Sequence, residues 1–566
     1  MIRRIEMNRE IYIDLMEKVM SAYTDEHIRA YTQTVVKNGI EEHGFPRLTA
    51  NLGILIAHNR KTEYKEKFIE MMDLCCKQIP VALGKNGWRA GNDFSVKEIV
   101  LCLLEAQKSE IFDKTLTDGW RKDLARINPH ETYTIIAPVP PKPVDNWAAF
   151  GAASEQVRKY AGIGDESDFI ENQIKSQLYS FDENGMYRDP NEPMVYDMVT
   201  RLQLAVALYF GYNGKSREEL EEKLLKSADI TLDMQSVTGE IPFGGRSNQF
   251  LHNETFYAAL CEFYADFFKK RGDMNKAGEF KNAAKLAVGN IIPWLNENPI
   301  RHIKNYYAND SKFGCEEYAY FDKYMITTAS WLYLAYIMAD DNIEEIDCPA
   351  ISKNTICETS EYFHKVMCRY NDYFVEFETN ADIHYDANGI GRIHKKGVPS
   401  AICLSVPFCE HPNYGIDVDN PSHYSVCAGI KTDNGYAYTF DASSKYKLVE
   451  KIVADEYVLV KFDCEICGGT KVSQTCILSE EGVEVRASGN GEVRILFVLL
   501  VYDGEQETKI TFAEKSAAVS YKGSQCIYST NGTITNMNQI YANRNGHYRA
   551  MAASGKDSVS LKIKMF

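Results

Sequence analysis

The chain has 566 residues, of which 45% are hydrophobic and 25% are charged, the composition of an ordinary globular protein. Lysine and arginine number 63 against 79 aspartate and glutamate residues, so the formal net charge is −16. This balance argues against non-specific nucleic-acid binding, because that affinity comes from basic side chains that neutralise phosphates. It does not exclude a small anionic ligand, since a few arginines in a cleft can act against the overall field.

The sequence has neither the pattern of a membrane anchor nor that of a leader peptide. Its longest apolar run, Ile495 to Tyr502, has eight residues, whereas a membrane-spanning helix needs about 20. Residues 1–10 lack the apolar stretch of a signal peptide. We therefore expect a protein that binds neither membrane nor nucleic acid and works in the cytoplasm, unless a secretion signal has been trimmed.

Fifteen cysteines are scattered along the chain without the spacing of a disulfide framework. Cys464 and Cys467 form a single CxxC pair, and no second pair stands at zinc-ribbon spacing. We interpret the cysteines as reduced, mostly buried thiols, and expect neither a metal nor another cofactor. The alternative is a structural metal at a group of irregularly spaced side chains, namely Cys409, His411, His423 and Cys427.

Apolar residues recur at intervals of three and four in the first part of the chain. This spacing predicts buried helices, as in the run of Phe256, Leu260, Phe263, Tyr264, Phe267 and Phe268. Long loops rich in glycine, proline, asparagine and aromatic residues recur near residues 43, 88, 142, 190, 243 and 313. Pairs of helical segments lie between these loops, so one unit of two helices takes about 50 residues. Six such units predict an N-terminal (α/α)6 toroid over residues 1–345.

The apolar period changes to two at about residue 361, which indicates strands. Tyr373–Thr379 and Ser558–Phe566 alternate in this way, and Asn434-Gly435 and Asp503-Gly504 are turn dipeptides. Residues 346–566 are therefore predicted to form an antiparallel β-sandwich domain. The expected fold class is multidomain, with the helical toroid first and the β domain after it.

Closure of the ring would bring the six long loops to one mouth. These loops carry tyrosines and tryptophans, whose flat faces suit sugar rings, and arginines, whose two-pronged geometry matches a carboxylate. Loops before helices favour polar caps in any case, so a structural role is the alternative for each residue. The candidate substrate-binding residues are Trp88, Arg89, Asn146, Trp147, Tyr187, Arg188, Tyr196, Arg201, Arg246, Asn248, Gln249 and Glu317.

Five residues near predicted helix starts are candidate catalytic groups. Asp197 and Glu254 follow the two most polar loops in consecutive units, so their carboxylates could flank one glycosidic bond. Asp322 is a reserve carboxylate, although it and Asp197 could equally be helix caps. His252 and Tyr320 are candidate bases. Phosphate-loop, GxGxxG, HExxH and GxSxG motifs are absent from the sequence.

The same segments resemble bacterial glycan-degrading enzymes that join an α/α toroid to a β-sandwich, and the likeness spans nearly the whole chain. The segments that carry it are Tyr187–Asp189, Tyr196-Asp197, Pro242–Gln249 with Glu254, and Glu317–Tyr324. The chain resembles the β-glucuronidases of glycoside hydrolase family 154 more closely than the heparinase II/III-like lyases. It lacks the Asn-His dipeptide of many toroid lyases, although His394 could supply a histidine from the β domain.

The resemblance implies an enzyme that removes glucuronic acid from glycans or oligosaccharides by hydrolysis. The alternative is a lyase that cleaves uronic-acid glycans by β-elimination. For that reaction Arg246, Asn248 and Gln249 could neutralise the uronate, with His252 or Tyr320 as base. A non-catalytic helical-repeat scaffold is the second alternative. The expected partner is an acidic oligosaccharide, and assembly into a homo-oligomer is left open.

Overall fold

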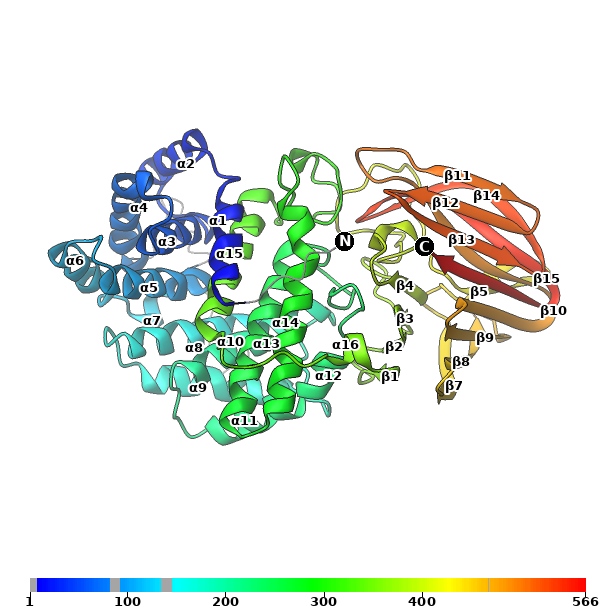
Figure 1. Cartoon of the computed structure of the whole chain (residues 1–566), viewed down its shortest axis with the longest axis horizontal. Helices are drawn as coiled ribbons and strands as arrows, with labels where there is room; N and C mark the ends of the chain where they lie inside the picture. The colour runs from blue at the N-terminus through cyan, green and yellow to red at the C-terminus, as the bar shows by residue number, and fades with distance from the viewer. Residues whose placement is uncertain (1–7, 82–91, 134–144, 467) are drawn as a thin grey trace.

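A computed structural model describes residues 8–81, 92–133, 145–466 and 468–566. The helices occupy the N-terminal part of the chain and the strands occupy the C-terminal part, and the two parts lie end to end along the longest axis (Figure 1). A helical region followed by antiparallel sheets is the arrangement that the change of apolar period predicts. That part of the fold prediction is confirmed.

Six helices contact one another in a closed cycle. They are α3 (Gly44–Ala57), α5 (Asn92–Lys108), α8 (Asp145–Tyr160), α10 (Met194–Tyr209), α13 (Leu251–Lys270) and α15 (Phe321–Met338). Each helix contacts the next in this order, and α15 contacts α3. Nearly every residue of α10 and α13 is buried, because a ring helix packs against two neighbours and against outer helices. We call these six the ring helices.

Further helices pack around the ring. They are α1 (Glu10–Met20), α2 (Asp25–Asn38), α4 (Lys65–Gln78), α6 (Lys114–Leu124), α9 (Ser167–Gln177), α11 (Arg217–Lys226), α12 (Ala228–Asp233) and α14 (Met274–Leu295), with the short α7 (Pro129–Thr132). α11 buries only Leu220 and Leu224, one stripe of its surface. α1 packs against α15, so the first and last helices of the ring region meet.

The C-terminal part contains two antiparallel sheets. The small sheet has the order β1 (Thr355–Glu358), β2 (Lys365–Tyr370), β3 (Tyr373–Glu378) and β4 (Gly389–Lys395). The path of the large sheet is β11 (Lys509–Ala513), β12 (Ser516–Tyr521), β13 (Ser524–Thr530), β15 (Gly546–Met565), β10 (Gly482–Tyr502), β9 (Thr470–Ser479), β8 (Tyr457–Ile466) and β7 (Lys445–Val453). Off this path, β14 (Thr533–Asn543) pairs with β15, and β5 (Ala428–Thr432) pairs with β10 and β6 (Gly435–Tyr438).

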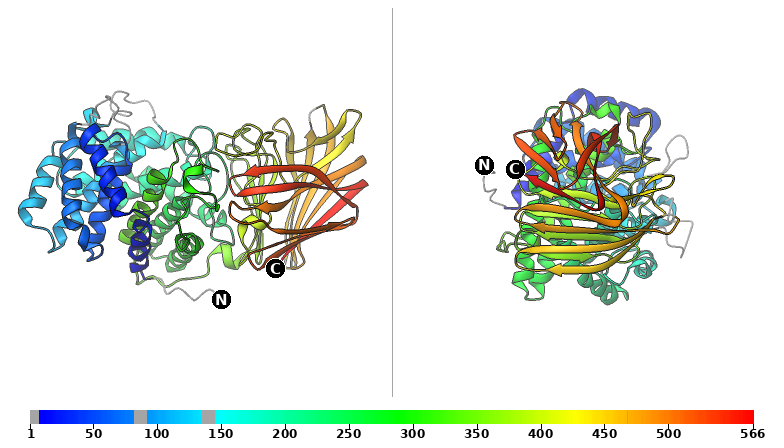
Figure 2. Two further views of the ribbon diagram at one scale, coloured as in Figure 1. Left: turned by 90° about the horizontal axis from the view of Figure 1, so that it is seen from above. Right: turned by 90° about the vertical axis from the view of Figure 1, so that its right-hand side faces the viewer.

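The small sheet lies between the helices and the large sheet (Figure 2). On β3, Phe374 belongs to the hydrophobic core of the helical part, whereas Val375 and Phe377 belong to the core shared with the large sheet. Successive side chains of a strand point to opposite faces. Glu376 and Glu378, which are fully buried, therefore face the helical part together with Phe374. The seam between the two parts of the molecule is thus lined with buried charge.

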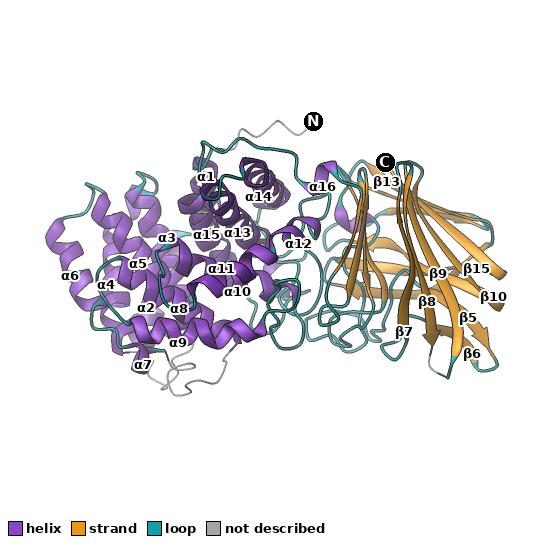
Figure 3. Cartoon of the chain, turned by 90° about the horizontal axis from the view of Figure 1, so that it is seen from below, coloured by secondary structure: helices purple, strands orange, loops and turns teal. Residues whose placement is uncertain are grey.

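The link between the two parts runs from the end of α15 at Met338 to the start of β1 at Thr355, and includes the short α16 (Pro349–Ser352). The predicted domain limit at residue 345 falls inside this link. Loops gather between the helices and the sheets, where the two parts meet (Figure 3).

Two further findings concern the cysteines and the helices of the described residues. The cysteines of the described part are all buried free thiols, as the sequence indicates. Among the described helices, none combines the length and the apolar character needed to cross a membrane.

Candidate active site

A cavity of about 700 Å³ lies at the N-terminal ends of the six ring helices. Each ring helix contributes a side chain from its first turns or its N-cap, namely His43, Phe94, Trp147, Tyr196, His252 and Tyr324. The free backbone N–H groups at a helix N-terminus carry partial positive charge. Six such ends around one cavity favour a ligand with negative charge or many hydrogen-bond acceptors.

Aromatic rings form much of the cavity wall. The rings of Phe94 and Trp147 lie 4.3 Å apart between centroids, and the other aromatic wall residues come mostly from α8, α10 and the start of α15. Tyr and Trp offer a flat apolar face beside a polar edge, which suits a sugar ring. The cavity volume lies in the range of small-molecule sites. The remaining aromatic wall residues are Phe150, Tyr196, Phe256, Tyr318, Tyr320, Tyr324 and Trp331.

Three tyrosine hydroxyls converge on the hydroxyl of Ser247. The Ser247 Oγ lies 3.0 Å from the hydroxyl of Tyr324, 3.2 Å from that of Tyr318 and 3.3 Å from that of Tyr196. Burial raises the pKa of Tyr324 well above its usual value, and Tyr196 and Tyr318 add to the effect. Tyr324 is therefore protonated at neutral pH and can donate a proton or a hydrogen bond into the cavity.

His252 stands in the first turn of α13 and lines the cavity. Its ring is stacked on Phe250 and lies edge-on to Tyr324, with centroids 4.7 Å apart. Its Nδ1 is buried and has no hydrogen-bond partner among the described residues. Burial lowers the pKa of His252 to about 3, and the nearby Arg47 adds to the effect. The imidazole is therefore neutral at physiological pH, and its Nδ1 is not held by any described hydrogen bond.

Two buried cations share one carboxylate at the inner end of the cavity. Arg47, only 3% exposed, lines the cavity and donates to Thr327 Oγ1 at 2.8 Å. Lys97 is fully buried, and its Nζ lies 5.2 Å from the ring of Trp331. Among the described residues, only Glu98 pairs with either cation, at 3.0 Å from Lys97 and 3.5 Å from Arg47. Burial lowers the pKa of both bases, so an anion bound beside Arg47 would be stabilised.

Arg246 lines the outer part of the cavity and is already partly paired. It forms an ion pair with Asp189 and donates to the carbonyl of Pro190 at 2.7 Å. Its guanidinium lies 4.2 Å above the ring of Tyr196, a cation–π contact. Asn146, another cavity residue, donates to the same Asp189 carboxylate at 3.0 Å. The structure thus places the predicted residues Asn146, Tyr196 and Arg246 side by side.

Asp197, a predicted catalytic carboxylate, does not line the cavity. It is fully buried and accepts two hydrogen bonds from Arg201, at 2.6 and 2.8 Å, and one from the backbone N–H of Tyr187 at 2.6 Å. The cap of α10 is Pro193, so Asp197 is not a helix cap either. Burial raises the pKa of Asp197 while Arg201 opposes that rise. The geometry gives Asp197, Arg201 and Tyr187 a structural role behind the cavity wall.

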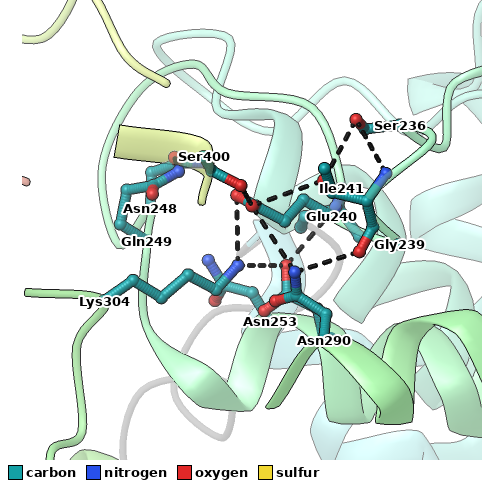
Figure 4. A network of polar contacts seen from close by, with 12 residues as sticks. Ser236, Gly239, Glu240, Ile241, Asn248, Gln249, Asn253, Asn290, Lys304 and Ser400 are labelled. Carbon is teal, nitrogen blue, oxygen red and sulfur yellow. Dashed lines mark hydrogen bonds and ion pairs between the residues drawn. The ribbon is translucent and has the colours of Figure 1, made fainter. Parts of the chain in front are cut away.

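Glu254, the second predicted carboxylate, lies in the charged seam between the helices and the small sheet. Its Oε1 is 2.7 Å from Lys304, whose ammonium also lies 3.4 Å from Glu240. Figure 4 shows Glu240 reaching both Lys304 and Ser400. Glu254 points away from the cavity because its partner comes from the loop after α14, so the predicted acid pair is not assembled there.

His394 is also a seam residue. It is 1% exposed, with Nδ1 at 2.9 Å from Ser236 Oγ and Nε2 at 3.0 Å from Ser405 Oγ. Burial lowers its pKa to about 3. Both ring nitrogens are therefore occupied, and this neutral histidine is closed off from the cavity.

Four more predicted residues lie outside the cavity. Arg188 donates to backbone carbonyls of residues 179 and 180. Asn248 donates to the carbonyl of Pro242, and Gln249 donates to Asn248 and accepts a hydrogen bond from Asn545 of the β domain. Glu317 is exposed. Trp88 and Arg89 fall outside the described residues.

A second, smaller cavity of about 230 Å³ adjoins the first and shares Glu41, Glu42 and Tyr320 with it. Asp322 lines this smaller cavity and lies 3.3 Å from His27. The cap of α15 is Tyr320, so Asp322 is in the first turn of the helix rather than at its cap. Of the two predicted residues here, Tyr320 borders both cavities and Asp322 only the smaller one.

Four important cavity residues were not among the candidates drawn from the sequence, although each stands within a segment or loop that was. Arg47 stands just after the loop near residue 43, and Ser247 directly follows Arg246. Tyr318 and Tyr324 lie on either side of Tyr320 in the sequence. These residues stand either in the first turn of a ring helix or close to a selected residue. Extending the selection to such positions would have included them. In the described part, no three His, Cys, Asp or Glu side chains are grouped so as to hold a metal ion.

Solved structures of glycan-degrading enzymes are similar to this chain. The crystal structure of heparinase III aligns with 92% of this chain and 77% of its own, at 9% identity and a TM-score of 0.51. The fold is similar to that of heparinase III. A heparan sulfate lyase mutant from Pedobacter heparinus covers 92% of this chain and 76% of its own, at 9% identity and a TM-score of 0.47.

A glycosyl hydrolase family 88 protein from Bacteroides vulgatus covers 59% of this chain and 99% of its own, at 12% identity and a TM-score of 0.38. A comparison with models of protein families gives no match, and neither does a search of curated proteins. At 9% identity the likeness to heparinase III shows a shared fold and does not show a shared reaction. The closer resemblance to glycoside hydrolase family 154 stays a prediction.

Proposed function

We propose that the protein cleaves acidic glycans or oligosaccharides at a uronic acid residue by β-elimination. The observation that carries this proposal is the pairing of a neutral, unpartnered His252 with a protonated Tyr324 beside the buried cation of Arg47. These are the three groups that elimination needs: a base, an acid and a group that neutralises the carboxylate. The fold shared with heparinase III is compatible with this chemistry but does not carry it.

The reaction assigns one task to each group. Arg47 holds the uronate carboxylate, which makes the neighbouring C5 proton more acidic. His252 takes that proton, and the electrons of the C5–H bond form the C4–C5 double bond while the C4–O4 bond breaks. Tyr324 donates its proton to the departing O4. Burial is the main reason that the pKa of His252 is low, and Arg47 lowers it further; a bound carboxylate would offset the charge of Arg47 and so raise that pKa.

Hydrolysis of a glucuronide, which the resemblance implies, is the second candidate. It requires two carboxylates, about 6.5–9.5 Å apart in an inverting enzyme. The carboxylates that line the described cavity are Glu41 and Glu42, which are adjacent in sequence. Glu42 is already bonded to Tyr31 at 3.0 Å and to Lys323 at 3.2 Å. The cavity therefore supports elimination better than hydrolysis.

The products distinguish these candidates. Incubation with uronic-acid oligosaccharides should yield an unsaturated uronate, which is detected by its ultraviolet absorbance. Release of saturated glucuronic acid would replace the proposal with hydrolysis. Binding without either product would favour the helical-repeat scaffold instead.

A further inference from the structure

The turn between β14 and β15 reaches from the large sheet into the loops of the helical part. Its two residues are Arg544 and Asn545, both at most 3% exposed. The Asn545 Nδ2 donates to Gln249 Oε1 at 3.1 Å and to the carbonyl of Lys304 at 2.9 Å. A β-carbon at Gly314 would meet the carbonyl of Arg544 at 2.8 Å, so the turn and this loop approach as closely as glycine allows.

Arg544 binds one carboxylate with both prongs of its guanidinium. Nη2 lies 2.7 Å from Glu316 Oε1 and Nη1 lies 3.1 Å from Glu316 Oε2, and Nη1 also donates to the carbonyl of Gly314 at 2.6 Å. Glu316 is 2% exposed. Glu316 Oε1 also accepts the backbone N–H of Ser247 at 2.6 Å. The β domain is thereby connected to Ser247 through one buried ion pair.

Ser247 has an unusual backbone conformation. Its φ is +60°, in the left-handed region, which is unfavourable for a residue other than glycine. The hydrogen bond from the Ser247 backbone N–H to Glu316 fixes that conformation. The Ser247 hydroxyl then lies within hydrogen-bonding distance of the three tyrosine hydroxyls of the cavity. A serine hydroxyl has one proton and two lone pairs, so three hydroxyl partners saturate it.

We infer that Arg544 is a positioning residue of the active site, acting through Glu316 and Ser247 on Tyr196, Tyr318 and Tyr324. The inference rests on the proposed function, in which Tyr324 is the acid. None of the described β-domain residues lines the cavity, yet the β domain sets where the tyrosine hydroxyls lie. A displacement of a reacting group by about 1 Å can lower the rate by about 10²-fold. A small shift of Arg544, Glu316 or Ser247 that moves the tyrosine hydroxyls should therefore lower the rate.

The first experiment compares two residues of the same turn. Arg544→Lys keeps the charge but loses the two-pronged bond to Glu316, and Asn545→Ala removes hydrogen bonds between the same two parts of the molecule without touching Glu316 or Ser247. We expect Arg544→Lys to lower kcat by about 10- to 100-fold with little change in KM. Asn545→Ala should keep kcat within about 2-fold, whatever its effect on Tm. Equal losses of kcat in the two variants would overturn the inference.

A second variant covers the case in which Arg544→Lys folds poorly. Ser247→Ala keeps the backbone N–H bond to Glu316 but removes the hydroxyl that gathers the tyrosines. We expect a loss of kcat like that of Arg544→Lys, again with little change in KM, and no such loss in Asn545→Ala. A kcat of Ser247→Ala equal to that of the parent would contradict the relay.

Crystal structures of the full-length variants separate this inference from the proposed reaction. In Arg544→Lys the hydroxyls of Tyr318 and Tyr324 should move away from Ser247, and in Asn545→Ala they should stay. Tyrosines that keep their positions in Arg544→Lys overturn the relay even if the parent protein is a lyase. If the parent forms no unsaturated product, the proposed function fails while the positions of the tyrosines still test the relay.

Discussion

The cavity and the seam between the helices and the small sheet are both rich in charged residues, but they use them differently. In the seam, Glu254, Lys304 and Glu240 form a chain of ion pairs. Arg47, which lines the cavity, shares the single carboxylate of Glu98 with Lys97, which lies behind the wall. A paired charge stabilises contacts between the two parts, whereas a surplus charge is available to a ligand. Whether a buried charged side chain has its own ion-pair partner therefore distinguishes structural residues from functional residues of the same type.

Two histidines sharpen this comparison. His252 and His394 are both buried, and burial lowers the pKa of each to about 3. The nitrogens of His394 both have serine partners, whereas His252 Nδ1 has none among the described residues. The neutral imidazole in the seam therefore has hydrogen-bond partners at both nitrogens, whereas the neutral imidazole at the cavity has a nitrogen without a described partner.

The largest effect is expected from removing the free histidine. His252→Ala should lower kcat by about 10²- to 10⁴-fold, the usual contribution of a general base, with Tm nearly unchanged. The matched control is His394→Gln, which should lower Tm because Ser236 and Ser405 lose a partner, and should leave kcat within about 3-fold. Steady-state kinetics and thermal melting measure both. If His394→Gln is the inactive variant, the base comes from the β domain and the assignment fails.

Breaking a paired carboxylate tests the opposite side of the comparison. Asp197→Asn leaves Arg201 as an uncompensated buried charge, which should cost about 3–5 kcal/mol in the free energy of unfolding. The kcat of the remaining folded protein should stay within a few-fold of the parent, because Asp197 does not reach the cavity. Denaturant unfolding measures the first quantity. A stable but inactive Asp197→Asn protein would return Asp197 to the role of a hydrolytic carboxylate.

The seam should also give stability a pH dependence between pH 6.5 and 9. Burial opposes the charging of His364, but Glu378 and Glu192 outweigh it and raise its pKa to about 9. The folded protein therefore holds a proton that the unfolded chain releases near pH 6.5. The stabilisation, roughly 3 kcal/mol at most, is complete below pH 6.5 and is lost as the pH rises through 9.

His364→Gln should flatten this alkaline fall in the free energy of unfolding, which denaturant titration at pH 6 to 9.5 measures. The other buried groups of the seam keep their own pH dependence, so the difference between parent and variant isolates His364. An identical slope in the two proteins would show that the His364 ion pairs do not contribute.

A smaller effect is expected from Arg246, in the outer part of the cavity. Arg246 is paired with Asp189, as the seam charges are paired with one another, yet it lines the cavity. Arg246→Lys should lower kcat/KM for uronides by about 10-fold, because a lysine cannot bind Asp189 and the carbonyl of Pro190 together and so displaces the positive charge of the cavity wall. The loss should be much smaller with a neutral hexoside. A parent enzyme that cleaves neutral hexosides as well as uronides would contradict the preference for acidic substrates.

Part of the cavity lining could be predicted from the sequence because loops before ring helices are local features. Trp147, Tyr196, Arg246, His252 and Tyr320 were selected on that basis, and all line the cavity. Helical periodicity fixes which loops begin a ring helix, and the short connections place those loops at one end. The structural role of Asp197 was also readable, since Arg201 follows it by four residues, the spacing of an ion pair on one helix.

The sequence by itself determined the order of helical and β parts, since the apolar period of 3.6 or 2 is a property of neighbouring residues. Only the tertiary structure decided which charges are paired. Lys304 meets Glu254 and Arg544 meets Glu316 across long stretches of chain, and no local pattern encodes such contacts. Whether a buried carboxylate acts on a ligand or holds the two parts together depends on whether it has a cationic partner. An unpaired buried charge is costly, whereas a charge that is already paired is not available to a ligand.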